Sequence, residues 1–300
     1  MYLDYSSVRM TNSTFENNSH SGIHLLDNID TYLQNITVQY NGFSGNSDEE
    51  KAGIHFDRSK TVSHPQLDVI CSSCDVMNSA GSGILIHDSA DLWLNDIYLA
   101  DNGANFTPLH ADNSGLNLGQ QGGVININGI EIHTERGTGT SIPAVEINQA
   151  AASIDSLLMH GNHSGIEWNG QNHNNYPSVM SNTTFSGTQC LQLSNHLDLS
   201  GIGNTISAEC TGTIQLVNSQ VNWSGFTDLG LTPTILQLDS NSDLHLHQPA
   251  NFDFTQSSPT IASGATIDVA YDINVWVINN NSNGIPGANV GASFLSLIHI

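Results

Sequence analysis

The segment Gly22-Ile23-His24-Leu25 returns as Gly53-Ile54-His55-Phe56 and again as Gly83-Ile84-Leu85-Ile86. Each copy has an aliphatic residue, a middle residue that is polar in most copies, and a second apolar residue, and a small residue precedes them in most copies. Six further copies read Gly115-Leu116-Asn117-Leu118, Ala144-Val145-Glu146-Ile147, Gly165-Ile166-Glu167-Trp168, Cys190-Leu191-Gln192-Leu193, Thr213-Ile214-Gln215-Leu216 and Ile235-Leu236-Gln237-Leu238. Their first aliphatic residues are 31, 30, 32, 29, 21, 25, 23 and 22 residues apart. Periods of this length are typical of solenoids.

The two apolar residues of each copy lie at positions i and i+2, which predicts a short strand with one buried face. Parallel stacking of nine such strands would bury a continuous apolar column, and a glycine before the strand permits a corner. A second phrase, Asn or Asp followed by alternating apolar residues, precedes most copies. It begins at Asn12, Asn35, Asn95, Asn128 and Asn182. Each coil therefore has at least two strands, and we expect a third short strand in most coils.

This repeat resembles the right-handed parallel β-helix superfamily, the fold of pectate lyases and polygalacturonases, over about residues 7 to 255. The predicted fold is all-β, a right-handed parallel β-helix of about nine coils over residues 1–262. From Ile267 to Ile278 a long alternating strand follows, and the next residues include Gly284-Ile285-Pro286-Gly287. This segment resembles the start of an immunoglobulin-like or carboxypeptidase-regulatory-like β-sandwich, which we expect, incomplete, over residues 263–294. We expect it to be poorly ordered or to pack on the last coil, and residues 295–300 resemble a translated sequencing adaptor.

The charge of the chain is strongly negative. Five Lys and Arg residues stand against 28 Asp and Glu residues, for a net charge of −23. This charge disfavours nucleic acids and anionic membrane surfaces as partners, and we expect neither nucleic-acid binding nor membrane insertion. Cations such as Ca²⁺ are natural counterions, but the chain has neither an Asp-x-Asp-x-Asp-Gly loop nor a Gly-Gly-x-Gly-x-Asp run. No specific calcium site, metal site or cofactor is predicted.

The four cysteines favour disulfides. Cys71 and Cys74 lack the second Cys pair of a zinc site, and Cys190 and Cys210 are about one coil apart. Eight Asn-x-Ser/Thr sequons add to this, at Asn12, Asn17, Asn35, Asn105, Asn162, Asn182, Asn222 and Asn280. Together they indicate a secreted or cell-surface protein. Because the repeat is already running at Val8 with no signal peptide or apolar span before it, we expect a fragment of a longer chain, monomeric as a solenoid.

Chemistry in such a fold would lie on outward positions, where stacking brings residues of successive coils to within ~4.8 Å. The first three coils place six candidate catalytic residues on one patch: His24, His55, Asp57, Arg58, His87 and Asp88. These groups suit acid-base chemistry on a polysaccharide. Stacked Glu146 and Glu167 are a second, weaker carboxylate pair. The competing interpretation is a polar ladder, in which stacked side chains hydrogen-bond one another.

Other candidates are weaker. The polygalacturonase motifs Asn-Thr-Asp, Asp-Asp and Gly-His-Gly are absent, and Asp57-Arg58-Ser59-Lys60 only loosely resembles that family's Arg-Ile-Lys. His245 and His247 share a strand face but show no third ligand, which favours a surface pair over a metal site. Trp93, Trp168 and Trp223 could stack on sugars, although Trp168 is at an inward position. The sequence therefore predicts an adhesive, glycan-binding or spacer scaffold. The alternative is a polysaccharide lyase or glycoside hydrolase that uses the first three coils.

Overall fold

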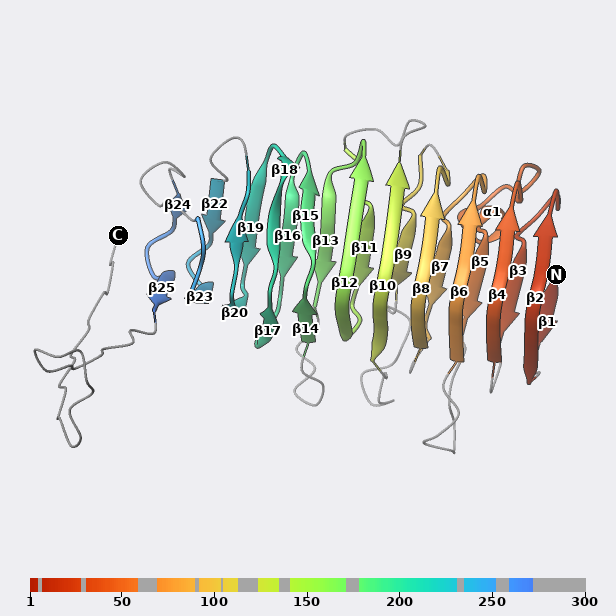
Figure 1. Ribbon diagram of the computed structural model, residues 1–300, viewed down its shortest axis with the longest axis horizontal. Coiled ribbons are helices and arrows are strands. Elements are labelled where there is room, and N and C mark those ends of the chain that lie inside the picture. Colours follow the sequence, from red (N-terminus) through yellow and green to blue (C-terminus); the bar gives the residue numbers. More distant parts are fainter. Residues whose placement is uncertain are drawn as a thin grey trace, which may run out of the picture.

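The computed structural model describes residues 1–4, 7–27, 31–58, 69–89, 92–103, 105–112, 124–134, 141–170, 178–230, 235–251 and 259–271. Within them the chain forms a right-handed parallel β-solenoid of about nine turns (Figure 1). Two long sheets run side by side along the axis, and each contains eleven strands that pair in parallel with the next coil. Fold class and repeat architecture are thus as the sequence predicts.

The first long sheet, sheet A, contains the repeated tetrapeptides. Its strands are β1 (Tyr2–Asp4), β3 (Ile23–Leu26), β5 (Ile54–Asp57), β7 (Ile84–His87), β9 (Leu109–Asp112), β11 (Val145–Asn148), β13 (Gly165–Asn169), β16 (Cys190–Ser194), β19 (Thr213–Val217), β22 (Ile235–Leu238) and β24 (Thr260–Ile261). The register joins equivalent residues of neighbouring copies, such as His24 with His55 and Glu146 with Glu167. Identical positions therefore form rows along the axis.

The second long sheet, sheet B, contains the Asn-led phrases. Its strands are β2 (Val8–Glu16), β4 (Thr31–Gln39), β6 (Val69–Met77), β8 (Leu92–Ala100), β10 (Ile125–Thr134), β12 (Ala152–Gly161), β14 (Ser178–Ser181), β17 (Leu199–Ile202), β20 (Gln220–Ser224), β23 (Asp243–His247) and β25 (Thr266–Ala270). A third sheet, sheet C, holds β15 (Thr184–Gly187), β18 (Thr205–Cys210) and β21 (Thr227–Asp228). The expected third strand is therefore separate in the later coils.

In the earlier coils the third strand is fused to the second through a corner residue. Asn12, Asn35, Ser73 and Asp96 have φ between 51° and 53°, and the same position in β10 is glycine. This left-handed residue bends the strand, and it lets the core residues on either side both point inward. Leu33 and Ile36, three positions apart, are both buried as a result.

The core is one column of aliphatic side chains with large aromatic side chains, most of them in the later coils. The largest fully buried side chains include Trp168, Trp223, Phe185 and Phe226. Trp168 is thus a core residue, as its inward position predicts, and Trp223 is buried as well. Trp93 is 40% exposed on the outer face of sheet B. Both predicted disulfides form, Cys71 with Cys74 and Cys190 with Cys210.

The fourth copy of the repeat is not where the sequence pattern indicated. The strand of that coil is β9, which pairs with β7 and with β11, whereas residues 113–123, including Gly115-Leu116-Asn117-Leu118, lie outside the described residues. The prediction was wrong because β9 follows Pro108 instead of glycine and has the small Ala111 at its second inward position. His110, and not Asn117, therefore occupies the outward position of this coil.

The solenoid continues past the predicted boundary at residue 262. β25, which contains Ile267 and Val269, pairs in parallel with β23 over five residues. It is therefore a strand of the last coil. The remainder of the expected β-sandwich, residues 272–294, and the adaptor-like residues 295–300 lie outside the described residues. Within the described part of the chain, no helix is long and apolar enough to span a membrane.

Candidate functional site

Histidines line the outer face of sheet A in its first coils. The parallel register places His24 beside His55, and the two rings stack with centroids 4.3 Å apart and planes 20° from parallel. His87 meets the His55 ring edge-on at 5.2 Å, and His110 lies 6.4 Å from His87. Of the residues that the sequence indicated, His24, His55 and His87 are thus brought together, and His110 joins them as a member that was missed because its strand was misplaced.

A short helix, α1 (Asp48–Lys51), lies over this face. Its N-terminus is capped by Ser47, whose side chain accepts from the backbone N–H of Glu50. The Asp48 carboxylate accepts two bonds of 2.9 Å from Ser82, one from the backbone N–H and one from the hydroxyl. On the other side the Ser21 hydroxyl donates to the backbone oxygen of Glu49. The helix is thus tied to the coils on both sides of His55.

Asp48 also faces His110 across the patch. His110 Nδ1 lies 3.7 Å from Asp48 Oδ2, and its Nε2 lies 3.9 Å from Glu146 Oε2. Burial by itself would lower the pKa of His110, but the bond to Asp48 and the charges of Asp48 and Glu146 raise it above its ordinary value. Burial would likewise raise the pKa of Asp48, yet its bonds from His110 and Ser82 hold it below normal. This end of the patch is a charge-paired contact.

His55 differs from His110, because it is buried without a carboxylate partner. The residue is 1% exposed, and neither ring nitrogen has a hydrogen-bond partner. Burial, with smaller effects from His24 and His87, lowers the pKa of His55 to about 2. Burial also lowers the pKa of His24, against the opposing charge of Asp57. The stacked pair is therefore uncharged at neutral pH.

Asp57 and Arg58 complete the patch at the end of β5. Asp57 Oδ2 lies 3.8 Å from His24 Nε2, and Asp57 Oδ1 lies 3.6 Å from Arg58 Nε. Arg58 also pairs with Asp27 at 3.2 Å. Both Arg58 and Asp88 adopt left-handed φ values, 47° and 46°, at the corner that follows their strands. Arg58 is therefore held between two carboxylates, and Asp88 is a corner residue.

Further along sheet A the same face becomes a polar ladder. Side-chain amides at the strand ends hydrogen-bond from coil to coil, from Asn148 to Asp112, Asn169 to Asn148, Asn195 to Asn169 and Asn218 to Asn195. Glu146 and Glu167 stack in register, and burial together with the charge of Glu146 raises the pKa of Glu167. The ladder interpretation holds for these later coils.

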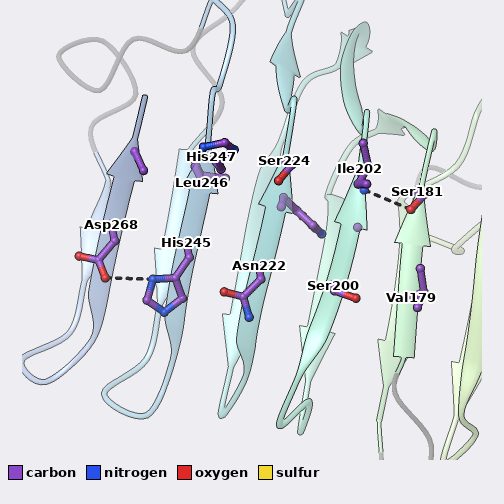
Figure 2. A pocket seen from close by; sticks show the side chains of 13 residues that line it. Val179, Ser181, Ser200, Ile202, Asn222, Ser224, His245, Leu246, His247 and Asp268 are labelled. Atoms are coloured by element: carbon purple, nitrogen blue, oxygen red, sulfur yellow. Dashed lines mark hydrogen bonds and ion pairs between the residues drawn. The ribbon is translucent and has the colours of Figure 1, made fainter. Parts of the chain in front are cut away.

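A second feature, which we call the sheet B groove, opens on the outer face of the last coils (Figure 2). It has a volume of about 520 Å³ and crosses β14, β17, β20, β23 and β25. One row of its lining is in register across the strands and consists of Val179, Ser200, Asn222, His245 and Asp268. A second row contains Ile202, Ser224, His247 and Ala270. The sequence indicated only His245 and His247, because rows across strands depend on register.

The third group near His245 that the sequence did not reveal is Asp268. His245 Nδ1 lies 2.9 Å from Asp268 Oδ2, an ion pair visible in Figure 2. Elsewhere on sheet B, Glu131, His133 and His160 place one ligand atom each within 4.8 Å of the others. The His133 ring nitrogen already contacts the Glu131 carboxylate at 2.7 Å. His245 and His133 are thus each paired with a carboxylate.

Comparison of the chain with protein-family models, with curated proteins and with solved structures finds no match. The fold resemblance therefore rests on the repeat and on the solenoid itself. Two faces remain as candidates for function, the histidine patch under α1 and the sheet B groove.

Proposed function

We propose that this protein is an extracellular scaffold that binds a neutral glycan chain in the sheet B groove. The observation that carries the proposal is a row of side chains that crosses five strands in register, beside a second row that crosses four of them. Neighbouring strands are ~4.8 Å apart, so the first row offers one side chain per strand over ~19 Å, and the second row adds another on four of the five strands. The spacing between strands is close to the length of one sugar unit in an extended chain.

The chemistry of the two rows suits sugars. Side chains that can hydrogen-bond sugar hydroxyls come from Ser200, Asn222 and His245. They lie on three consecutive strands and form one continuous row along the groove. Ile202 is 65% exposed in the neighbouring row and offers an apolar surface to a sugar ring. The net charge of −23 disfavours anionic polysaccharides, which leaves neutral glycans as the class of ligand.

The histidine patch supports a second function, a carbohydrate-active enzyme. The observation in its favour is that His24, His55 and Asp57 converge beneath the residue 43–52 excursion that contains α1. Two features weigh against it. His55 has a pKa of about 2 and is unsuited to proton transfer at neutral pH, and Arg58 is already paired with two carboxylates.

The test is titration calorimetry with neutral oligosaccharides of four to six units, with polygalacturonate as the anionic comparison. Asn222→Ala and His245→Ala should each weaken binding of the neutral ligand by about tenfold, the effect of a lost sugar hydrogen bond. Gln34→Ala, at an outward position of β4 in the early coils, is the matched control and should leave binding unchanged. Equal loss in all three variants, or preference for polygalacturonate, would contradict the proposal.

Product analysis of the same mixtures separates the two functions. A scaffold leaves the oligosaccharides intact. Cleavage that is abolished by Asp57→Asn but survives Asn222→Ala would replace the scaffold function with the enzyme function.

A further inference from the structure

His55 is a buried polar residue without partners. Both of its ring nitrogens are inaccessible to solvent and unbonded, and the buried Nε2 of the adjacent His24 also lacks a hydrogen bond. Buried polar atoms are nearly always bonded, and an unsatisfied group costs about 1–3 kcal/mol. Another buried histidine, His163, differs because its Nε2 is 3.3 Å from the Ser186 hydroxyl. The His55 arrangement therefore calls for a ligand that accepts its lone pair.

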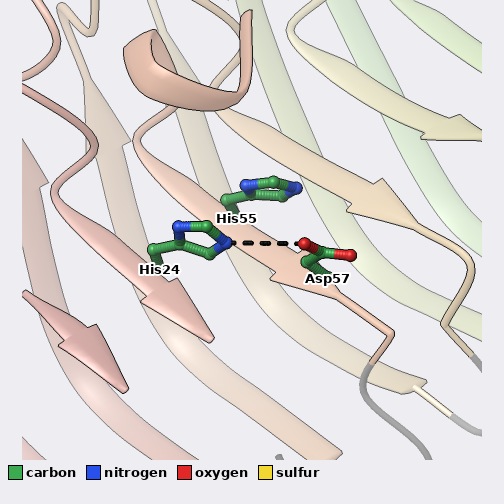
Figure 3. Close-up of side chains that lie close together, drawn as sticks. All are labelled: His24, His55 and Asp57. Carbon is green, nitrogen blue, oxygen red and sulfur yellow. Dashed lines mark ion pairs between the residues drawn. The ribbon is translucent and has the colours of Figure 1, made fainter. Parts of the chain in front are cut away.

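The surrounding groups form a set of metal ligands. His24, His55 and Asp57 each place one ligand atom within 4.8 Å of the others. His55 and Asp57 are two residues apart on β5, so both point outward, and the β3–β5 register adds His24. Figure 3 shows the two imidazole rings one above the other, each with a nitrogen at the end nearest the Asp57 carboxylate.

The neighbouring arginine orients the carboxylate for this role. Arg58 Nε lies near Asp57 Oδ1, and Asp57 Oδ2 faces His24. One carboxylate oxygen is thus left directed toward the two imidazoles. Outer-shell contacts of this kind orient metal ligands.

We propose that His24, His55 and Asp57 bind a divalent transition-metal ion of the Zn²⁺ class. Two imidazoles and one carboxylate are a donor set that Zn²⁺ accepts, whereas Ca²⁺ takes oxygen ligands. Ligand bonds of about 2.0–2.1 Å place ligand atoms about 3.4 Å apart in a tetrahedron, so the three groups draw together and the stacked rings turn on binding. The side chains of His24 and Asp57 are 24% and 25% exposed, which leaves the fourth position open to solvent.

The cluster of Glu131, His133 and His160 provides an internal control. It has the same number of imidazoles and carboxylates, but its glutamate and a histidine are already joined by a 2.7 Å contact on an exposed strand face. A metal ion at this second cluster would displace the contact between His133 and Glu131. It would not provide a partner for a buried nitrogen that lacks a hydrogen bond. We therefore place the ion at His55 and not at this second cluster.

The experiment uses the full chain, stripped of metal with a chelator and then titrated with Zn²⁺ by calorimetry and with Co²⁺ by visible absorption. We expect one tight site per chain, a Co²⁺ spectrum with nitrogen ligands, and a rise in the thermal unfolding midpoint with Zn²⁺. Asp57→Asn and His24→Gln, both at partly exposed positions, should weaken Zn²⁺ binding at least tenfold, in the range known for altered ligand shells. His133→Ala should bind Zn²⁺ as the unaltered chain does.

The outcomes distinguish the site from adventitious binding by surface histidines. Absence of a tight site, or a tight site lost in His133→Ala and kept in Asp57→Asn, would overturn the proposal. Circular dichroism of each metal-free variant shows whether it retains the β-solenoid. If Asp57→Asn does not fold, His24→Gln supplies the same comparison. Glycan binding in the sheet B groove is measured separately, so failure of either proposal leaves the other intact.

Discussion

The broad early coils, residues 23–144, differ from the tight later coils, residues 145–247, in what covers their faces. The early coils bury His55 beneath α1, with histidines stacked along sheet A. Within the described residues, the later coils carry an amide ladder on sheet A and a groove on sheet B. One repeat therefore builds two kinds of surface.

The number of residues between successive sheet A strands accounts for the difference between the two kinds of surface. Successive sheet A strands begin 20–25 residues apart in the tight coils, just enough for the strands and their corners. The early coils are up to 36 residues long, and one of their excursions forms α1. A longer connection costs little additional loop entropy, so such excursions are tolerated and can carry a site.

The largest expected effect tests whether the tight coils depend on their large aromatic side chains. Trp168 is fully buried, and its indole N–H donates to the backbone oxygen of Ala150 at 3.1 Å. Trp168→Ala should lower the free energy of unfolding by about 3–5 kcal/mol because it leaves a cavity and an unpaired carbonyl. Urea unfolding followed by tryptophan fluorescence measures this.

The matched control is Trp93→Ala in the broad coils, because Trp93 is 40% exposed. Its substitution should change the free energy of unfolding by less than about 1 kcal/mol. Similar losses at both positions would show that the two groups of coils do not differ in this respect.

The next effect concerns acid sensitivity within the tight coils. Burial lowers the pKa of His196 to about 4, although its bond to the Trp168 carbonyl opposes this. The unfolded chain gains a proton near pH 6.5, and the folded chain only near pH 4. Stability is therefore complete above pH 6.5 and falls by roughly 3 kcal/mol as the pH drops to 4.

The measurement is the urea midpoint at pH values from 4 to 7 for the unaltered chain and for His196→Gln. The variant should show the smaller loss of stability in acid. His20→Gln, at an exposed position of the first coil, should keep the slope of the unaltered chain. Identical slopes in all three proteins would refute the assignment to His196.

The smallest expected effect tests how α1 is held over His55 in the early coils. Asp48→Ala removes both bonds to Ser82 and leaves its buried N–H unpaired, at a cost of about 1–3 kcal/mol. We expect α1 to detach locally, so that His55 becomes open to modification by diethyl pyrocarbonate, as mass spectrometry would detect. Glu50→Ala is the control, since that carboxylate bonds Asn46 within the same excursion. If His55 stays unmodified in Asp48→Ala, α1 remains in place without the hydrogen bonds between Asp48 and Ser82.

Much of this protein could be predicted from its repeat. The i, i+2 pattern of Ile23 and Leu25 gave the strand, its inward face and its parallel neighbour, because side chains alternate along any strand. The disulfide between Cys190 and Cys210 also followed from coil spacing, since the two residues are about one coil apart. The strand of the fourth coil was assigned to the wrong residues because Pro108 and Ala111 depart from the repeated phrase. The last strand was assigned to a β-sandwich because its alternation of apolar and polar residues fits either a sandwich or a solenoid.

The sequence by itself determined the solenoid, its acidic surface and the outward position of the early histidines, since each depends on local periodicity or on composition. Only the tertiary structure decided that His55 is buried, that Asp48 reaches His110, and that Ser200, Asn222 and His245 form a row. Burial depends on where a long excursion lies, and rows depend on the register between coils. Both are set by contacts between residues distant in the chain, which no local pattern specifies.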